Sequence, residues 1–163
     1  SVLSQEGVNL EFVIIDDAEI KQKIGTGVLE GMQPAFRHRP ANLDPVQQRM
    51  YEGAEHLATT FAKVPAWILG CARKIYPPQA PQDVFMYSTI YPAAQNPIVA
   101  ARSMNIGTAF TTFHQVAEPL IREVLHIPDD VYLCVLVAVG YPERPFGKVR
   151  RKPVEQVLHW NGW

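Results

Sequence analysis

Cysteine is scarce in this chain, so a disulfide framework is excluded from the start. The two cysteines, Cys71 and Cys134, both lie inside apolar runs, where a thiol usually packs as a small core residue. Neither run places a base beside the sulfur, which argues against a catalytic thiol. Free cysteines are typical of reducing compartments, so we expect a cytoplasmic protein.

The chain also lacks an excess of charge of either sign, and it lacks long hydrophobic runs. Lys and Arg number 15 against 16 Asp and Glu, so no overall field favours nucleic acid or an anionic membrane. No apolar stretch approaches the roughly 20 residues that span a bilayer. The five histidines are scattered without the spacing of metal ligands. We therefore expect no nucleic-acid partner, no membrane partner and no metal site.

The length and the patterning indicate a single domain that begins with a strand and a helix. A chain of 163 residues is long enough for one hydrophobic core. The β-branched run Leu10–Ile15 predicts a strand, and the acidic pair Asp16-Asp17 can cap a helix over 18–24. From Gly25 to Leu43 glycine, proline and arginine accumulate, which predicts an irregular lid or binding loop.

Helical and strand patterns alternate through the rest of the chain, which predicts an α+β fold. Asp44-Pro45 starts a helix whose apolar stripe, from Val46 to Phe61, should pack one face on the core. Further strands are predicted at 66–72, 108–113 and 132–141, and further helices at 88–105 and 117–125. Pro97 should kink the longer helix, and Gly107 should cap it in a left-handed conformation.

The C-terminal segment, residues 142–163, joins a basic cluster to the aromatic-rich ending HWNGW. The two tryptophans of this ending, Trp160 and Trp163, are large apolar side chains whose burial is strongly favourable. A disordered terminus would leave both of them in water. We therefore expect the segment to dock, either on the rest of the fold or on another subunit.

Four segments in one order resemble the nitroreductase family: YSTIYPAAQNPIVAARSMNIGTAFTT, HIPDDV, VLVAVGYP and RRKPVEQVLHWNGW. The resemblance covers residues 10–163 and is strongest from Ser88 onward. It implies a nitroreductase-like mixed or antiparallel sheet flanked by helices, in a homodimer whose chains interlock through long helices and extended tails. FMN would lie at the interface, and hydride would pass from NAD(P)H through the flavin to a nitroaromatic, quinone or similar small-molecule acceptor.

The resemblance also assigns a phosphate site to the C-terminal segment. The arginine of the family's basic-x-Pro element, which binds the FMN phosphate, falls on Arg151, two residues before Pro153. A guanidinium suits this role because its planar fork bonds two phosphate oxygens at once. Arg150 and Lys148 would assist, whereas Val149 stands where the family often has a lysine. The alternative is a solvated basic tail without a ligand.

Further flavin contacts are implied at the turn after the long helix. Ile106, Gly107 and Thr108 match the family's turn whose backbone lies near the flavin ring, and glycine allows close approach. A plain helix cap explains the glycine equally well. His114 either donates to a flavin oxygen or is a structural residue. No catalytic side chain is assigned, because the hydride chemistry belongs to the cofactor.

The chain departs from the family at its start. The family's arginine-bearing helix, which holds the FMN phosphate and ribityl groups, does not precede Ser1, and Glu6 and Val8 stand where side-chain amides hold the flavin edge. We therefore interpret residues 1–163 as a single nitroreductase-like domain, N-terminally truncated relative to the family. Two hypotheses follow: an FMN-dependent NAD(P)H oxidoreductase, or a non-catalytic dimer or ligand-binding protein of the same fold without stable flavin.

Overall fold

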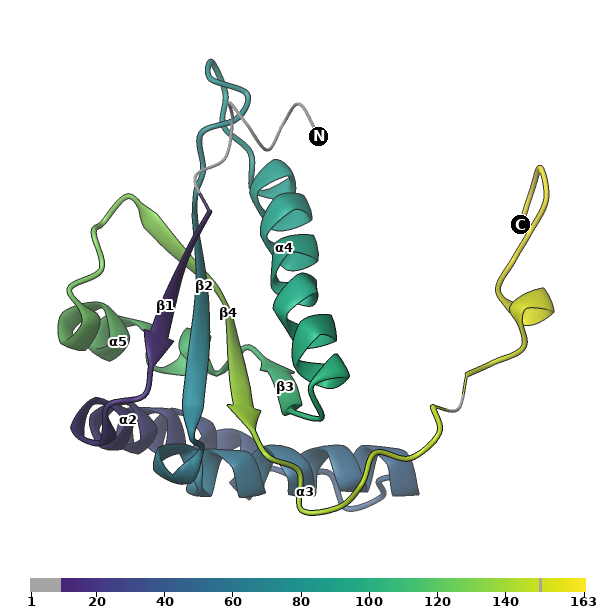
Figure 1. The fold of residues 1–163 in the computed structure, drawn as a ribbon, viewed down its shortest axis with the longest axis horizontal. Helices are drawn as coiled ribbons and strands as arrows, with labels where there is room; N and C mark the ends of the chain where they lie inside the picture. The colour runs from purple at the N-terminus through teal and green to yellow at the C-terminus, as the bar shows by residue number, and fades with distance from the viewer. Residues whose placement is uncertain (1–9, 150) are drawn as a thin grey trace.

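The computed structural model describes residues 10–149 and 151–163, and its centre is a four-stranded antiparallel sheet. The strands are β1 (Leu10–Ile15), β2 (Ala66–Arg73), β3 (Gly107–Thr111) and β4 (Val131–Gly140), in the order β1-β2-β4-β3 (Figure 1). β4 lies between β2 and β3 and packs against helices on both faces, which explains its nearly continuous apolar sequence. The predicted strands are confirmed, each within two residues of its expected bounds.

Helices cover both faces of the sheet, which confirms the predicted α+β architecture. α4 (Asp83–Ser103) packs on one face against β2, β3 and β4. The other face carries α2 (Ala18–Arg37), α3 (Pro45–Thr59), α5 (Glu118–Leu125) and the short 3-10 turns η1 (Phe61–Lys63) and η2 (Phe113–Val116) (Figure 1). Successive residues of each strand therefore point into different layers.

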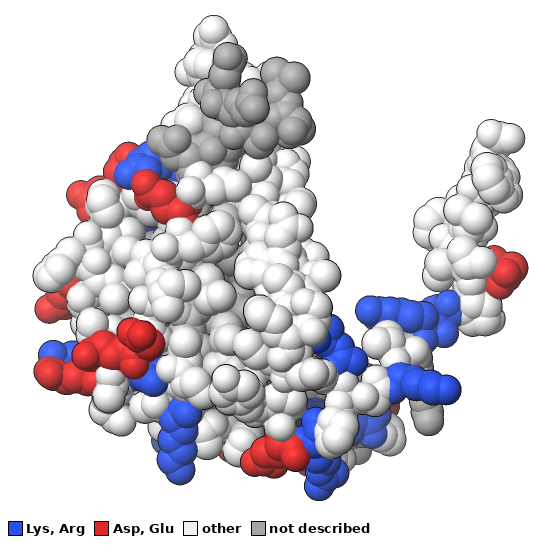
Figure 2. Space-filling view, viewed as in Figure 1, with Lys and Arg blue, Asp and Glu red and all other residues white. Residues whose placement is uncertain are grey.

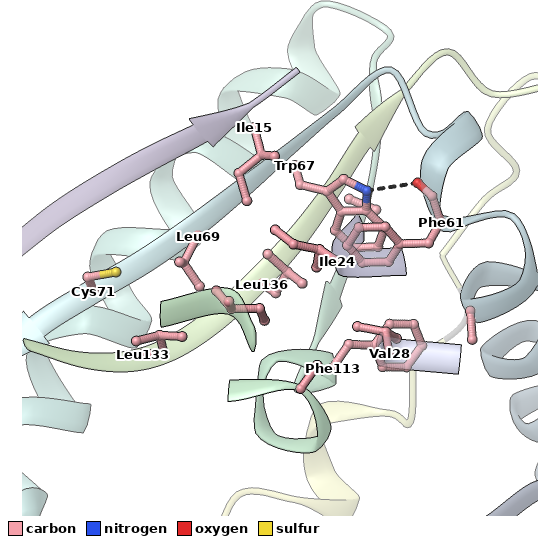
Figure 3. Close-up of a cluster of buried hydrophobic side chains, with 14 of the residues drawn as sticks. Ile15, Ile24, Val28, Phe61, Trp67, Leu69, Cys71, Phe113, Leu133 and Leu136 are labelled. Carbon is pink, nitrogen blue, oxygen red and sulfur yellow. Dashed lines mark hydrogen bonds between the residues drawn. The ribbon is translucent and has the colours of Figure 1, made fainter. Parts of the chain in front are cut away.

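The larger core layer lies between the central strands and the helix α2 (Figure 3). Trp67 stacks on Phe61 with ring centroids 4.1 Å apart, and its indole N–H donates to the Phe61 carbonyl at 3.1 Å. Ile24 and Val28 of α2 are fully buried in the same layer. Complete burial of an aliphatic side chain contributes about 1.5–3 kcal/mol. This layer therefore holds α2 firmly on the sheet.

α2 corrects the predicted lid, because residues 25–37 continue the helix instead of leaving it. Its glycines are sites of close packing. A Cβ on Gly27 would lie 2.4 Å from Leu120 Cδ2, and one on Gly31 would lie 2.6 Å from the Val116 carbonyl oxygen. Glycine costs a helix only about 1 kcal/mol relative to alanine, which packing on α5 and η2 offsets. Residues 38–44 form the irregular connection to α3.

The long helix α4 begins earlier than predicted, at Asp83, and continues through Pro92 and Pro97. The left-handed residue after it is Asn105, with φ of 58°, whereas Gly107 already belongs to β3. Asparagine tolerates this region because its short polar side chain can bond locally. The prediction that glycine caps this helix is therefore wrong.

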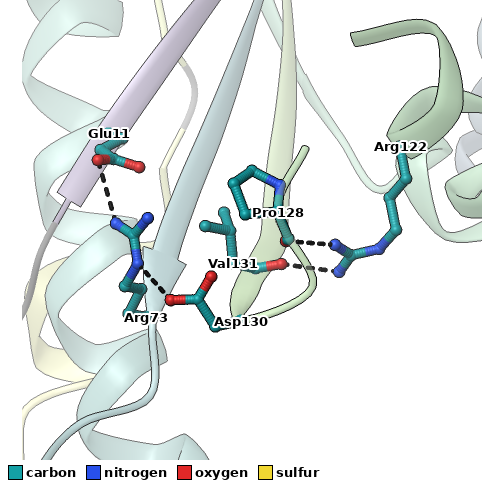
Figure 4. Close-up of polar contacts among 6 residues, drawn as sticks. All are labelled: Glu11, Arg73, Arg122, Pro128, Asp130 and Val131. Atoms are coloured by element: carbon teal, nitrogen blue, oxygen red, sulfur yellow. Dashed lines mark hydrogen bonds and ion pairs between the residues drawn. The ribbon is translucent and has the colours of Figure 1, made fainter. Parts of the chain in front are cut away.

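Two arginines tie strand ends to neighbouring elements (Figure 4). Arg73, at the end of β2, forms ion pairs with Glu11 at 3.1 Å and with Asp130 at 2.7 Å. Arg122 of α5 donates to two backbone carbonyls of the α5–β4 turn at 3.1 and 2.7 Å. Both guanidiniums are engaged in structural contacts, so neither is a candidate ligand for an anion.

The tail, residues 141–163, extends away from the sheet (Figure 1). Its described residues are exposed, and the short turn η3 (Val154–Gln156) interrupts an otherwise irregular path. Trp160 is 82% exposed and Trp163 is fully exposed. Beyond Phe146 the described residues of the tail do not dock on their own chain, so docking on another subunit stays a prediction.

Candidate functional site

An apolar groove lies between the α2–α3 pair and the segment that follows β3. Its volume is about 650 Å³, within the range of small-molecule sites. Met32 and Phe36 of α2 and Met50 and Tyr51 of α3 form one side, and Phe113 of η2 lies on the other. Among the described residues, no charged side chain lines it. The groove therefore suits a flat, uncharged ring system.

The start of α3 is fixed locally, and this places the groove's aromatic wall. The Asp44 carboxylate accepts from the backbone N–H groups of Val46 and Gln47 at 2.7 and 2.9 Å, and the Gln47 side chain accepts from the Asp44 N–H. This reciprocal cap stabilises a helix start by about 1 kcal/mol. The Arg39 guanidinium lies 5.6 Å from the centroid of the Tyr51 ring and holds it from the side of the α2–α3 connection.

The groove corrects the prediction that the whole α3 stripe packs on the core. Ala58 and Phe61 are buried, but Val46 and Met50 are 67% and 65% exposed. Sequence periodicity cannot tell a groove wall from a core face, because both need apolar residues at helical spacing. The groove residues of α2 were missed because that part of the helix was predicted to be irregular. A helical assignment for 25–37 would have revealed the Met32 and Phe36 face.

The side of the groove at the end of β3 supplies its polar groups. The Thr111 hydroxyl donates to the Leu136 carbonyl at 2.8 Å, so it is committed to the sheet. Thr112 and Gln115 also line the groove, and their side chains make no hydrogen bond within the described part of the chain. These two side chains are therefore available to the polar edge of a ligand.

A second hollow, of about 540 Å³, adjoins the groove. Leu57 and Ala109 line both. Gly107 and Thr108 line the second hollow, so two of the three predicted turn contacts lie beside the groove, whereas Ile106 lines neither. The predicted turn and the apolar groove thus form one continuous region at the β3 edge of the sheet.

Gly107 has a structural explanation within its own chain. It pairs with Gly140 across the β3–β4 ladder, and a Cβ on Gly107 would lie 3.2 Å from the Gly140 carbonyl oxygen. That distance is tighter than about nine in ten real Cβ contacts, so a side chain here would require the Gly140 backbone to shift by a few tenths of an ångström. The non-functional explanation of this glycine therefore has direct support, and a flavin contact at Gly107 stays a prediction.

The predicted phosphate ligands are not beside the groove in a single chain. Lys148 and Arg151 are exposed on the tail, and Arg150 lies outside the described residues. Figure 2 shows Lys and Arg side chains gathered where the tail leaves the body of the molecule. One chain therefore presents an uncharged groove, with Lys63 lining the adjoining hollow, and a basic tail that extends away from the body of the molecule.

His114 belongs to the core. Its side chain is 2% exposed, lines neither hollow, and its Nδ1 has no hydrogen-bond partner among the described residues. Burial lowers the pKa of His114 below its ordinary value, and the nearby Glu118 carboxylate opposes this only in part. The structural interpretation of this histidine is the one its burial supports.

Two further features are absent from the described residues. No group of three or more His, Cys, Asp or Glu side chains is arranged to hold a metal ion. No described helix is long and apolar enough to cross a membrane. The groove and the adjoining hollow are therefore the features on which a functional assignment rests.

FMN fits this region in part. The isoalloxazine ring is flat with apolar faces and polar edges, which matches the apolar walls and the Thr112 and Gln115 side chains. The phosphate is best held by cationic donors, and no cationic side chain lines the groove. Lys63 lines the adjoining hollow, whereas the cations that the resemblance assigns to the phosphate, Arg151 and Lys148, lie on the tail.

Solved structures of FMN enzymes share the fold. An iodotyrosine deiodinase bound to FMN and 3-iodo-L-tyrosine matches 94% of this chain and 77% of its own, with a TM-score of 0.70 at 18% identity. An FMN- and NADPH-dependent nitroreductase from Sphigopyxis sp. matches 94% of this chain and 80% of its own, with a TM-score of 0.61 at 14% identity. At these identities the likeness shows the fold alone.

Sequence comparison narrows the assignment from a shared fold to one family. An FMN reductase (NADPH) from Bacillus subtilis is 37% identical over 81 residues, which are 48% of this chain and 32% of that protein. The matched part thus spans about a third of the relative's length. The model of the Nitroreductase family matches residues 6–141, most of the chain. The chain therefore belongs to the nitroreductase family.

Proposed function

We propose that this protein is an FMN-dependent oxidoreductase that acts as a cytoplasmic homodimer and uses NAD(P)H as its reductant. The observation that carries the proposal is the uncharged groove of about 650 Å³ at the edge of a nitroreductase-family sheet. When bound, FMN supplies the hydride chemistry, accepting hydride from a nicotinamide and passing it to an acceptor. The unpaired cysteines are consistent with a reducing compartment.

The protein's own residues bind and orient. Phe36, Met50 and Tyr51 offer apolar surface to the faces of a ring, and they exclude water from it. Thr112 and Gln115 offer hydrogen bonds to a polar edge, which fixes the orientation of the ring in its plane. The lack of charged groove side chains favours uncharged flat acceptors, such as quinones and nitroaromatics without carboxylates, because a buried unpaired charge is costly.

In this proposal the phosphate is held by a tail that comes from a second copy, which the path of the tail away from its own chain supports. Arg151 carries the planar fork that matches a phosphate, with Lys148 and Arg150 as weaker neighbours. Because the tail points away from its own groove, a partner's groove is the site it can serve (Figure 1). The homodimer is thus part of the flavin site in this proposal.

The proposal is tested by titrating FMN and riboflavin into two variants. Arg151→Ala should weaken FMN binding by at least about tenfold, the scale of one lost charge-assisted hydrogen bond, and should leave riboflavin binding nearly unchanged. Gly53→Leu should weaken both ligands, because Gly53 lines the groove and a Cβ there meets nothing within 4 Å, so leucine would occupy ligand space. Leucine also favours helix, so lost stability would not explain the loss.

The two variants separate the alternatives. If Gly53→Leu leaves both affinities unchanged, the groove is not the flavin site. If FMN affinity survives Arg151→Ala but falls in Arg150→Ala, the register of the tail is wrong. If the unaltered protein binds neither flavin, the chain is instead the flavin-free dimer or ligand-binding protein of the same fold.

A further inference from the structure

The tail makes its last described contact with its own chain at Phe146. The guanidinium carbon of Arg102, in the last turn of α4, lies 3.4 Å from the centroid of the Phe146 ring. Beyond Phe146, no hydrogen bond, ion pair or ring contact joins the described residues of the tail to the body. These later residues are also exposed. One cation–π pair therefore marks the boundary between the held part and the free part of the tail.

The path to this pair is stiff. After β4 ends at Gly140, Pro142 and Pro145 restrict the backbone dihedrals of the segment that reaches Phe146. Asn105, in its left-handed conformation, turns the chain after α4 and lines the same hollow of about 690 Å³ as Arg102 and Phe146. The segment between Gly140 and Phe146 thus runs back past the end of α4.

The Arg102 guanidinium is available for a cation–π contact with the Phe146 ring. It forms no ion pair among the described residues, so the Phe146 ring is the partner that the structure gives to its guanidinium. Guanidinium is weakly hydrated and stacks well on aromatic faces, which makes Arg better than Lys for this contact. An exposed cation–π pair of this kind stabilises one conformation over others by a modest factor.

We propose that Arg102 and Phe146 form a clasp that sets the direction in which the tail leaves its chain, and so delivers Arg151 to the phosphate site of a second copy. The proposal rests on the proposed function. Both are positioning residues, since neither is assigned a ligand contact. Fixing the tail at Phe146 instead of Gly140 shortens the free segment before Arg151, which raises the local concentration of that guanidinium at its target.

The clasp is tested first without any flavin, by the distance between two spin labels. Labels on Glu55→Cys of α3 and Gln156→Cys of the tail, both exposed positions, are diluted into unlabelled protein so that distances within one chain are measured. Phe146→Leu should widen the distance distribution, and Phe146→Trp should keep it narrow, because tryptophan is the best cation–π partner. An equally narrow distribution in Phe146→Leu would overturn the clasp.

The positioning role is then read from FMN affinity in the same variants. Phe146→Leu should weaken FMN binding about two- to fivefold, the scale of an exposed cation–π pair, and Phe146→Trp should restore it. Riboflavin affinity should not change. Unchanged FMN affinity in Phe146→Leu, together with a clear loss in Arg151→Ala, overturns the positioning role and leaves the proposed function intact. Unchanged affinity in Arg151→Ala defeats the proposed phosphate site, while the label distances still decide whether the clasp exists.

Discussion

At the scale of single residues, Cys71 and Cys134 show how the sheet separates two thiols that lie on neighbouring strands. Cys71 packs in the larger core layer, whereas Cys134 packs on the other face against Met86 and Ile90 of α4. Burial raises the pKa of Cys71 to about 12 and that of Cys134 to about 11. Because the thiolate is the reactive form, both sulfurs should be inert in the folded protein.

This inertness is measurable by alkylation. With iodoacetamide at about pH 8, where an ordinary thiol with a pKa near 8.5 is partly ionised, the native protein should remain unmodified over an hour by mass spectrometry. The same protein in denaturant should take up two adducts, one for each cysteine. Rapid labelling of either cysteine in the native protein would show that its strand opens or that its burial is wrong.

His114 makes the stability of the fold depend on acidity. Its folded-state pKa is lowered by burial, so at acidic pH the unfolded state binds more protons at this residue than the folded state. Its contribution to the free energy of unfolding is therefore full above the unfolded pKa of about 6.5 and falls as the pH drops below that value. Urea unfolding at about pH 7.5, 6 and 5 should show this decline.

The variant His114→Leu measures how much His114 contributes to the loss of the free energy of unfolding at acidic pH. Leucine keeps an apolar volume in the core and removes both the titration and the unpartnered Nδ1 atom. Replacing a buried unpaired polar group with an apolar one is nearly neutral or stabilising. The variant should therefore equal or exceed the parent at neutral pH and lose less stability on acidification. An identical pH slope in both proteins would mean that other groups cause the decline.

At the scale of elements, α2 is held to the start of β2 by a buried lysine. The Lys21 ammonium group donates to the carbonyls of Val64 and Pro65 at 2.9 and 3.0 Å, and the side chain is only 7% exposed. These carbonyls lie just before β2, where the chain cannot use them in the sheet ladder. The lysine thus satisfies two backbone carbonyls that the sheet leaves unpaired, as a capping residue satisfies the free backbone groups at a helix end.

Removing that ammonium group should destabilise the protein. Lys21→Met keeps the aliphatic stem but leaves two carbonyls without their donor, at a cost of about 1–3 kcal/mol in the free energy of unfolding. Lys23→Met is the matched control, because Lys23 lies in the same helix and forms an exposed ion pair with Glu19. Urea unfolding should separate the two variants clearly. Equal stability of both would show that water replaces the lysine.

Elements differed in how far local sequence predicts them. β1 and β4 are recognisable because β-branched or continuous apolar runs have few other stable arrangements. α2 was recognisable only over 18–24, because Gly25, Gly27 and Gly31 weaken the helical signal of the rest. These glycines are explained only by the approach of η1, α5 and η2 to the helix. The groove was missed with it, since its walls come from segments distant in sequence.

At the scale of the whole molecule, the exposed tail is the main reason to expect a homodimer. Tyr141 and Trp160 are more than 80% exposed and Trp163 is fully exposed, while the outer edge of β3 pairs with no strand in the described part of the chain. Monomers seldom leave so much aromatic surface and an open strand edge in water. A second copy would cover both and would satisfy the docking that one chain does not provide.

Light scattering at micromolar concentration should therefore give about twice the mass of the single chain, as expected for the commonest symmetric assembly. The double variant Trp160→Ala, Trp163→Ala should shift the equilibrium toward monomer, because it removes the largest exposed apolar side chains of the tail. The variant Val46→Ala, which alters an exposed apolar residue of α3 outside the groove lining, serves as the control. A monomeric parent protein would remove the basis for a shared flavin site.

The amino-acid sequence by itself determined the class of fold, the strands and the order of segments that marks the family, because these depend on local periodicity and on short motifs. Only the tertiary structure showed that the Gly140 carbonyl oxygen leaves little room for a side chain at Gly107. It also showed that His114 belongs to the core and that the groove lies between α2, α3 and η2. Finally, it decided that the tail, whose sequence contains Arg151, extends away from the body of its own chain. Such facts depend on which segments, distant in sequence, pack against one another in the fold, and no local sequence pattern encodes that packing.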